Sequence, residues 1–225
     1  FHKYQCSITG YQFFYPFEIA GDGAFYEKLQ QFEWYYLPAK WEHTVAMKYI
    51  QENSSVLEIG CATGNFLRNL EKGFNKLNLI GIDLNEKAIA ETKQQGIVAI
   101  NTTIESHAKT IKNEYDVVCA FQLLEHIDTV SSFLTSAITT LKQRGRLIFS
   151  VPNNNSFIKH NEGGTLNFPP HHMGLWKPDV FKKVAKYYGL NVINIIREPL
   201  QKVHFDYFIQ VHEQRIKKLE LLNKI

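Results

Sequence analysis

The clearest chemical signal in the sequence is an acidic residue followed by a turn of small residues. The run 56–65 begins as a short apolar strand that contains Glu58, and it continues through Gly60, Ala62 and Gly64. Apolar residues then recur at helical spacing, so a helix should follow the turn. A strand, a tight turn and a helix N-terminus together present backbone N–H groups to a ligand at the carboxyl edge of a sheet. The sequence therefore predicts a cofactor cradle.

A second acidic residue follows the next apolar stretch. Asp83 comes directly after residues 77–82 and lies nineteen residues beyond Gly64. In a Rossmann-like sheet, a carboxylate at this place can accept hydrogen bonds from both ribose hydroxyls. The turn lacks the G-x-G-x-x-G spacing of dinucleotide folds, so a nicotinamide cofactor is the least favoured choice.

The turn resembles the first motif of the class I methyltransferases, E/D-x-G-x-G-x-G, with Ala62 in place of the middle glycine. The resemblance covers about residues 40–212 and implies S-adenosylmethionine as cofactor. The cofactor-binding residues it implies are Glu58, Gly60, Cys61, Ala62, Gly64, Asn65, Asp83, Leu84, Thr103, Ile104, Phe121 and Gln122. The family usually has an acid near Thr103 for the adenine amino group. Without one, adenine recognition would rest on hydroxyls, backbone and Ile104.

Residues 115–127 resemble the fourth motif of small-molecule methyltransferases such as the quinone O-methyltransferases, D-V-V followed by L-E-H. Methyl transfer to a hydroxyl needs alignment, exclusion of water and removal of one proton. Histidine suits the last task because its unperturbed pKa is about 6.5. The catalytic candidates are His171, His172, His126 and Glu125. We expect His171 or His172 to be the base, whereas His126 is better explained by a structural role and Glu125 by orienting a loop or capping a helix.

Two alternatives stay open beside the small-molecule enzyme. Some quinone methyltransferases and the methyltransferases of small-RNA 2′-hydroxyls carry E-x-x-E-H with a later histidine and hold a divalent ion. Here Gln122 replaces the first carboxylate, which weakens a hard-cation site, so we expect no metal. The formal charge of only +3 also disfavours a nucleic-acid partner, so we expect a small-molecule acceptor. The second alternative is a catalytically silent module that binds S-adenosylmethionine and regulates a partner.

Strands alternating with helices must bring these groups to one sheet edge. We expect strands at 56–59, 77–82, 97–100, 115–120 and 146–151, two late strands at 190–196 and 204–211, and helices at 40–50, after Gly64, and at 85–95, 129–142 and 179–188. This order is typical of a doubly wound α/β sheet. The resemblance implies a Rossmann-like sheet of seven strands with the last one antiparallel.

A chain of 225 residues is long enough for one domain at 41–225, preceded by an aromatic-rich extension at 1–40. The extension either covers the sheet as a layer or forms a lid over the substrate pocket. The irregular connection at 153–178 is long enough to be functional. Three cysteines without a pairing pattern and the lack of a run of transmembrane length indicate a cytoplasmic protein. The oligomeric state stays open.

Overall fold

The structure, a computed structural model, describes residues 1–32, 40–161 and 165–222. Contacts between Cα atoms divide the chain into two compact units. We call Gly21–Val151 the sheet unit, and Phe1–Ala20 together with Pro152–Ile225 the terminal unit. Residues 33–39 of the expected N-terminal extension lie outside the described residues.

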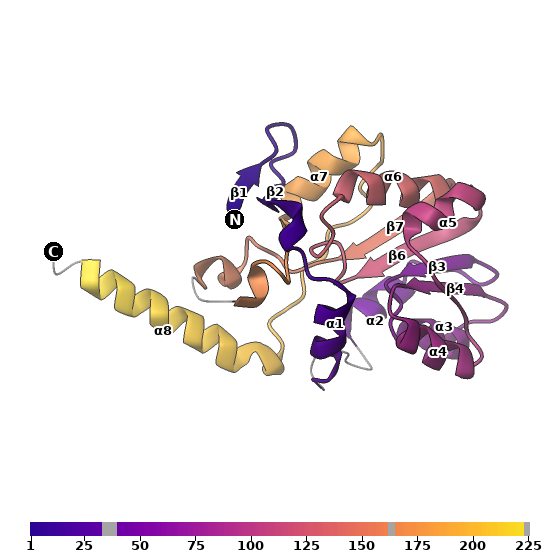
Figure 1. The fold of residues 1–225 in the computed structure, drawn as a ribbon, viewed down its shortest axis with the longest axis horizontal. Helices are drawn as coiled ribbons and strands as arrows, with labels where there is room; N and C mark the ends of the chain where they lie inside the picture. The colour runs from indigo at the N-terminus through magenta and orange to yellow at the C-terminus, as the bar shows by residue number, and fades with distance from the viewer. Residues whose placement is uncertain (33–39, 162–164, 223–225) are drawn as a thin grey trace. The chain divides into compact units, whose positions relative to one another are not determined.

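The sheet unit is built on a parallel sheet of five strands in the order β5-β4-β3-β6-β7. Its strands are β3 (Ser55–Ile59), β4 (Asn78–Asp83), β5 (Val98–Asn101), β6 (Tyr115–Phe121) and β7 (Leu141–Ser150). Its helices are α1 (Gly23–Gln30), α2 (Trp41–Met47), α3 (Asn65–Gly73), α4 (Glu86–Gln94), α5 (Ile104–Thr110) and α6 (Val130–Thr140). Figure 1 shows α3 and α4 on one side of this sheet and α5 and α6 on the other. The expected doubly wound α/β architecture with a parallel central sheet is confirmed.

The chain order of the strands creates a switch point beside β3. From β3 the chain passes to β4 on one side and later to β6 on the other, so β3 pairs with both. In this pairing Glu58 lies between Gly81 of β4 and Cys119 of β6. Ligands of open α/β sheets bind beyond the carboxyl ends of the strands at such a point.

Apolar packing holds the first strand and helix of the cradle together. Val56 and Leu57 of β3 are fully buried, and α3 buries Phe66, Leu67 and Leu70 to 1% exposure or less. These three residues lie on one helical face because they are spaced by one, three and four positions. Burial of each such side chain contributes about 1.5–3 kcal/mol, so the strand–turn–helix segment is anchored at both ends.

Local capping explains where α4 begins. The side chain of Asn85 accepts hydrogen bonds from the backbone N–H groups of Lys87 (3.1 Å) and Ala88 (3.2 Å). These bonds satisfy donors that the first helical turn leaves unpaired. The start expected from Asn85 is therefore confirmed, and it sets α4 immediately after the acid that ends β4.

The terminal unit combines both ends of the described chain. Its elements are β1 (His2–Gln5), β2 (Gln12–Tyr15), β8 (Gly174–Leu175), η1 (Phe17–Ile19), η2 (Phe157–His160), η3 (Thr165–Asn167), α7 (Pro178–Tyr187), η4 (Lys202–His204) and α8 (Phe205–Leu222). The strands form an antiparallel sheet in the order β1-β2-β8. Phe14 of β2 is 1% exposed, and its N–H donates to the carbonyl of Met173 (2.9 Å). The first residues of the chain therefore fold together with the segment that follows Pro152.

The prediction of two late strands, at 190–196 and 204–211, is wrong. Residues 190–196 have no regular structure, and Val192, Ile193 and Ile196 are 45%, 69% and 44% exposed. Residues 204–211 lie instead in η4 and α8, where the least exposed positions are spaced as one helical face. Aromatic and β-branched residues favour a strand only where a partner strand pairs with them. In 204–211 the least exposed residues lie along one face of a helix instead, so this segment is helical. Seven strands are therefore not confirmed.

α5 corresponds to none of the expected helices; of its residues only Ile104 carried a prediction, as a contact for adenine. Thr103 caps this helix by accepting a hydrogen bond from the N–H of Ser106 (3.1 Å).

Across the described parts of the chain, no helix combines the length and the apolar composition that a bilayer span requires.

Close packing at Gly81 in the middle of β4 provides a test of this core. A Cβ atom at Gly81 would lie 2.6 Å from Sγ of Cys61 and 3.0 Å from Cδ1 of Leu67. We expect Gly81→Ala to lower the free energy of unfolding by about 1–3 kcal/mol, measured by urea denaturation, because overpacking strains the core. Gly23→Ala is the control, since a Cβ there meets nothing within 4 Å. Equal stability of the two variants would contradict the packing.

Candidate active site

The turn between β3 and α3 has left-handed backbone at three of its small residues. The φ angles are +74° at Gly60, +46° at Ala62 and +73° at Gly64. Gly64 is the N-cap of α3, and a Cβ atom there would lie 2.7 Å from Cγ2 of Thr92. Glycine alone combines this φ angle with this space. The first N–H groups of α3 lack partners within the helix and can serve an anionic or polar ligand.

Two side chains hold the peptide groups of Ala62 in this turn. The N–H of Ala62 donates to Oδ2 of Asp83 (2.8 Å), and its carbonyl accepts from Oγ1 of Thr92 (3.0 Å). A left-handed conformation costs an L-residue about 1–2 kcal/mol, so alanine needs such restraints where the motif has glycine. Because Asp83 ends β4 and Thr92 lies in α4, the neighbouring strand and helix fix the shape of the cradle.

The acidic residue of the motif, Glu58, is 4% exposed in the middle of the sheet. Burial raises the pKa of its carboxyl group well above the usual range; the Lys40 ammonium opposes this rise and the Asp83 carboxylate adds to it. Its Oε2 atom has no hydrogen-bond partner among the described residues. A buried oxygen without a partner is suited to a donor that a ligand brings.

The second acidic residue, Asp83, is bound by backbone on both oxygens. Oδ2 accepts from Ala62 and Oδ1 accepts from the N–H of Asn85 (2.8 Å). Burial raises the pKa of Asp83, and these backbone donors oppose the rise. Each carboxylate oxygen has a second lone pair, so Asp83 can still accept from ribose hydroxyls. That role stays a prediction.

Residues after β4 and β5 lie at the same sheet edge. Asp83 pairs with Asn101, whose Nδ2 donates to the carbonyl of Asp83 (3.0 Å). Leu84 is 68% exposed, Ile104 is 2% exposed, and the Thr103 hydroxyl caps α5. The structure therefore brings the expected ribose and adenine residues to neighbouring strand ends, and their contacts with adenine stay predictions.

Two further residues of the expected cofactor set support the turn from within. Cys61 is 3% exposed, and burial raises the pKa of its thiol, so it packs as an apolar group. Asn65 opens α3; its Nδ2 donates to Oγ1 of Thr63 (3.3 Å) and its Oδ1 accepts from the Arg68 guanidinium.

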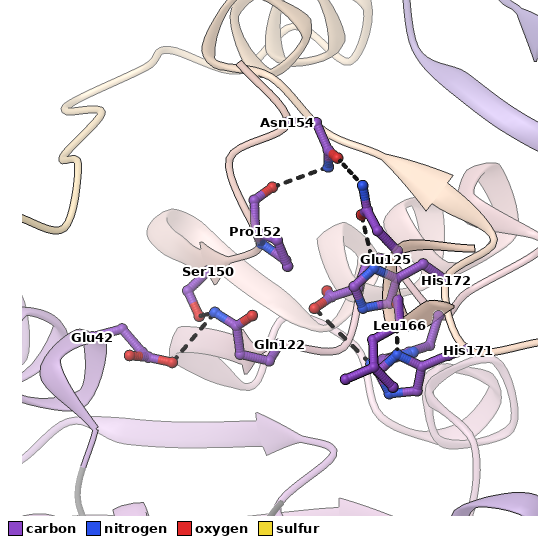
Figure 2. A network of polar contacts seen from close by, with 11 residues as sticks. Glu42, Gln122, Glu125, Ser150, Pro152, Asn154, Leu166, His171 and His172 are labelled. Carbon is purple, nitrogen blue, oxygen red and sulfur yellow. Dashed lines mark hydrogen bonds and ion pairs between the residues drawn. The ribbon is translucent and has the colours of Figure 1, made fainter. Parts of the chain in front are cut away.

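The end of β6 is held by α2 and β7. Gln122 has a φ angle of +50°, and its backbone N–H donates to the carbonyl of Ser150 (2.9 Å). Its Nε2 lies 3.4 Å from Oε1 of Glu42 and 3.3 Å from Oγ of Ser150 (Figure 2). Just before it, the ring of Phe121 lies 4.9 Å from the His43 ring and 4.7 Å from the Phe66 ring. Phe121 and Gln122 are thus fixed in place at the strand end.

Glu125 and His126 follow β6 in the sheet unit. Glu125 is 1% exposed, and burial raises its pKa to about 8, so it holds a proton at neutral pH. Its Oε2 atom has no hydrogen-bond partner among the described residues. Nε2 of His126 lies 3.9 Å from Oε1 of Glu125, and the centroids of the His126 and Tyr26 rings are 5.4 Å apart at an interplanar angle of 78°. A protonated Glu125 is better suited to donating a hydrogen bond than to accepting a proton.

His171 and His172 lie in the terminal unit as a stacked pair. Their ring centroids are 4.6 Å apart at 21°, and each residue is 7% exposed. Nδ1 of His171 is 2.9 Å from the carbonyl of Leu166, and Nδ1 of His172 is 3.2 Å from Oδ1 of Asn167 (Figure 2). Burial lowers the pKa of His171, so its ring is neutral at neutral pH. The expected convergence of this pair with His126 stays a prediction.

Sequence reasoning missed two residues of the site. Lys40 immediately precedes α2, and its ammonium lowers the pKa of both Glu58 and Glu125. Thr92 is fully buried, and its hydroxyl also lies 2.9 Å from the carbonyl of Ala88 within its own helix. A lone lysine before a helix and a threonine inside one carry no motif, so no signal in the sequence marked them.

A match to a protein family identifies the domain that carries this turn. Residues 33–195 match the family described as "Methyltransferase domain". The chain belongs to the methyltransferase-domain family. This confirms the resemblance on which the expected cofactor residues rested.

Individual relatives agree with this assignment. The chain is 31% identical over 110 residues to the ubiquinone biosynthesis O-methyltransferase of Hydrogenovibrio crunogenus, covering 46% of this chain and 45% of that protein. It is 26% identical over 152 residues to the Sodalis glossinidius protein of the same name, covering 62% and 60%. The chain thus matches about half the length of the first of these curated relatives. The family match, over residues 33–195, covers a larger part of this chain than the 46% covered by the Hydrogenovibrio crunogenus protein.

Solved structures share the fold. A SAM-dependent methyltransferase from Archaeoglobus fulgidus superposes with a TM-score of 0.56 at 21% identity, covering 78% of this chain and 83% of that chain. The plantazolicin methyltransferase BpumL, solved with a pentazolic desmethylPZN analogue and S-adenosylhomocysteine, gives a TM-score of 0.53 at 20% identity, covering 65% of this chain and 61% of that chain. At these identities the likenesses concern the fold.

The hydroxyl of Thr92 can be tested by substitution. We expect Thr92→Val to weaken S-adenosylhomocysteine binding about 5–10-fold in calorimetry, because a net hydrogen bond contributes about 0.5–1.5 kcal/mol and the turn loses one restraint. Thr92→Ser keeps the hydroxyl and should bind within about twofold of the parent protein. Equal weakening in both variants would assign the effect to packing of the threonine methyl group.

Proposed function

We propose that this domain transfers the methyl group of S-adenosylmethionine to an oxygen of a small-molecule acceptor, with nitrogen as the less favoured acceptor atom. The observation that carries this proposal is the restrained left-handed turn at Gly60–Gly64, which lies beside the buried Glu58 and the half-buried Asp83. The site fits the cofactor, because Glu58 has a buried oxygen without a partner among the described residues and the turn has glycine at its first and last positions, where no side chain obstructs a ligand.

Named residues would hold the cofactor at this edge of the sheet. Oε2 of Glu58 would accept a hydrogen bond from the cofactor, and Asp83 would accept hydrogen bonds from its ribose hydroxyls. Phe121 and Gln122 would flank the methyl donor. When bound, S-adenosylmethionine supplies a methyl group that the sulfonium charge already activates. The protein then has to align the acceptor, exclude water and take up one proton.

The histidine pair is the proposed source of the base. The acceptor O–H bond breaks as its proton passes to an imidazole nitrogen of His171 or His172. The deprotonated oxygen would then accept the methyl group that the cofactor supplies, with S-adenosylhomocysteine as the leaving group. His171 suits this role because burial keeps its ring neutral. His126 and Glu125 are proposed as positioning residues, since Glu125 holds a proton at neutral pH.

The acceptor class is proposed from the relatives. Both curated relatives described above are O-methyltransferases by name, which supports an oxygen acceptor. The aromatic N-terminal extension at 1–40 would cover a flat or apolar acceptor as a lid. In the terminal unit the Tyr11 ring lies 4.6 Å from the buried ring of Trp176, so part of this extension packs against the segment that follows Pro152.

The base assignment predicts a defined loss of turnover. We expect substitution of the true base, His171→Gln or His172→Gln, to lower kcat on a panel of phenolic acceptors by about 10²–10⁴-fold, the contribution of a positioned base. S-adenosylhomocysteine binding in calorimetry should stay unchanged. In the parent protein kcat should fall only below about pH 6.5, because a base with a lowered pKa stays neutral to more acidic pH.

His2→Gln is the matched control, since His2 is exposed in β1. Unchanged turnover in both paired variants would remove these residues as bases. Cofactor binding without turnover of any acceptor would favour a silent regulatory module. The absence of any binding heat from a folded protein would overturn the proposed function as a whole.

Metal independence is proposed from the amide of Gln122, whose Nε2 faces Glu42 and Ser150 where related metal sites have a carboxylate. We expect EDTA to leave kcat unchanged and added magnesium to have no effect. Neutral imidazole nitrogens also suit softer divalent ions such as zinc, so zinc belongs in the same experiment. Activity that EDTA abolishes and one of these ions restores would contradict the proposal and favour metal-assisted transfer, including transfer to an RNA 2′-hydroxyl.

A further inference from the structure

A chain of amide side chains in the terminal unit leads to the ring of His172. We propose that Asn154 and Asn167 are positioning residues that fix the tautomer of His172, with the proton on Nδ1 and the lone pair on Nε2. The catalytic meaning of this tautomer rests on the proposed function, in which the histidine pair supplies the base. The tautomer itself follows from hydrogen bonds within one unit.

The chain starts at a group that can only accept. Nδ2 of Asn154 donates to the carbonyl of Pro152 (3.3 Å), and a carbonyl oxygen has no proton to offer. The amide of Asn154 must therefore direct its NH₂ group to Pro152 and its Oδ1 elsewhere. Asn154 is 6% exposed, and its backbone N–H donates to the carbonyl of Trp176 (2.9 Å), so the residue is held on both sides.

The direction of the first bond sets the direction of the next two. Oδ1 of Asn154 accepts from Nδ2 of Asn167 (2.9 Å), which leaves Oδ1 of Asn167 at 3.2 Å from Nδ1 of His172 (Figure 2). An amide oxygen accepts, so Nδ1 of His172 must donate. A neutral imidazole has one donor and one acceptor nitrogen, so Nε2 carries the lone pair.

The neighbouring ring has the same tautomer for an independent reason. Nδ1 of His171 lies 2.9 Å from the backbone carbonyl of Leu166, which again can only accept. Both stacked rings therefore hold their protons on Nδ1. In His171 the backbone imposes this state, whereas in His172 it depends on two side chains that can be substituted.

The tautomer matters because only the unprotonated nitrogen of a neutral ring can take up a proton. If Nε2 of His172 removes the acceptor proton, the resulting imidazolium keeps its Nδ1–H bond to Asn167. The amide then stabilises the charged state without reorganising. Asn167 thus plays the part that an orienting group plays beside other catalytic histidines.

Tautomers can be read directly by long-range ¹H–¹⁵N correlation NMR of the full chain, with the His172 signals identified by their loss in His172→Gln. We expect the parent protein to show Nδ1–H and unprotonated Nε2 at His172. Asn167→Leu should shift this ring toward Nε2–H and lower kcat by about 10-fold or more, within the contribution of a positioned base. Its affinity for S-adenosylhomocysteine should not change.

Asn167→Asp gives a signature that a purely structural role would not produce. A carboxylate keeps an acceptor at Nδ1 and adds a negative charge, which favours the imidazolium and raises the pKa of His172. We expect the tautomer to persist and the acidic limb of the kcat profile to move to higher pH. Asn155→Asp is the matched control, because Asn155 is exposed in the same segment.

Asn154→Leu tests the start of the chain. Without Oδ1 of Asn154 the amide of Asn167 can turn either way, so both tautomers of His172 should appear. A parent protein with Nε2–H at His172, or a tautomer that none of these variants moves, would overturn the proposal. The expected tautomers together with full turnover in His172→Gln would leave the tautomer assignment intact and overturn only the base role of His172.

Discussion

The hydrogen bonds to the peptide groups of Ala62 are the constraint on which the cofactor cradle depends. One comes from the acid that ends β4 and the other from a buried hydroxyl in α4, so the turn after β3 is shaped by the strand and helix beside it. Alanine disfavours this left-handed backbone, and glycine would tolerate it without help. In this protein, hydrogen bonds from other elements stabilise the left-handed backbone that a glycine in the motif would adopt unaided.

Burial shifts the pKa values of the acidic groups near the cradle. Glu58 and Glu125 are almost fully buried, and burial is the main cause of the raised pKa of each. Lys40 favours the ionised form of both carboxyl groups, so its charge opposes the effect of burial. These groups can therefore respond to the charges of a ligand more strongly than exposed carboxylates would, because the surrounding dielectric is low.

Sequence patterns predicted the parts of the fold whose signals are local. The apolar run of β3 and the cap at Asn85 are set by residues close in the chain, and the structure confirms both. The segment 204–211 shows where such patterns fail. Its alternation of aromatic and β-branched residues favours a strand, but its least exposed positions are spaced as a helix face. No helix was predicted over α5, where only Ile104 carried an expectation, as a contact for adenine.

By itself, the sequence determined the parallel α/β architecture, the position of the small-residue turn and the identity of the two acids beside it. These follow from residue type and spacing along a continuous stretch. Only the tertiary structure decided that Thr92 bonds the turn, that Lys40 acts on two buried carboxyl groups, and that Asn154 and Asn167 orient His172. Each of these depends on the direction of a hydrogen bond or on the distance between charges from separate elements. Such quantities exist only once the elements have packed.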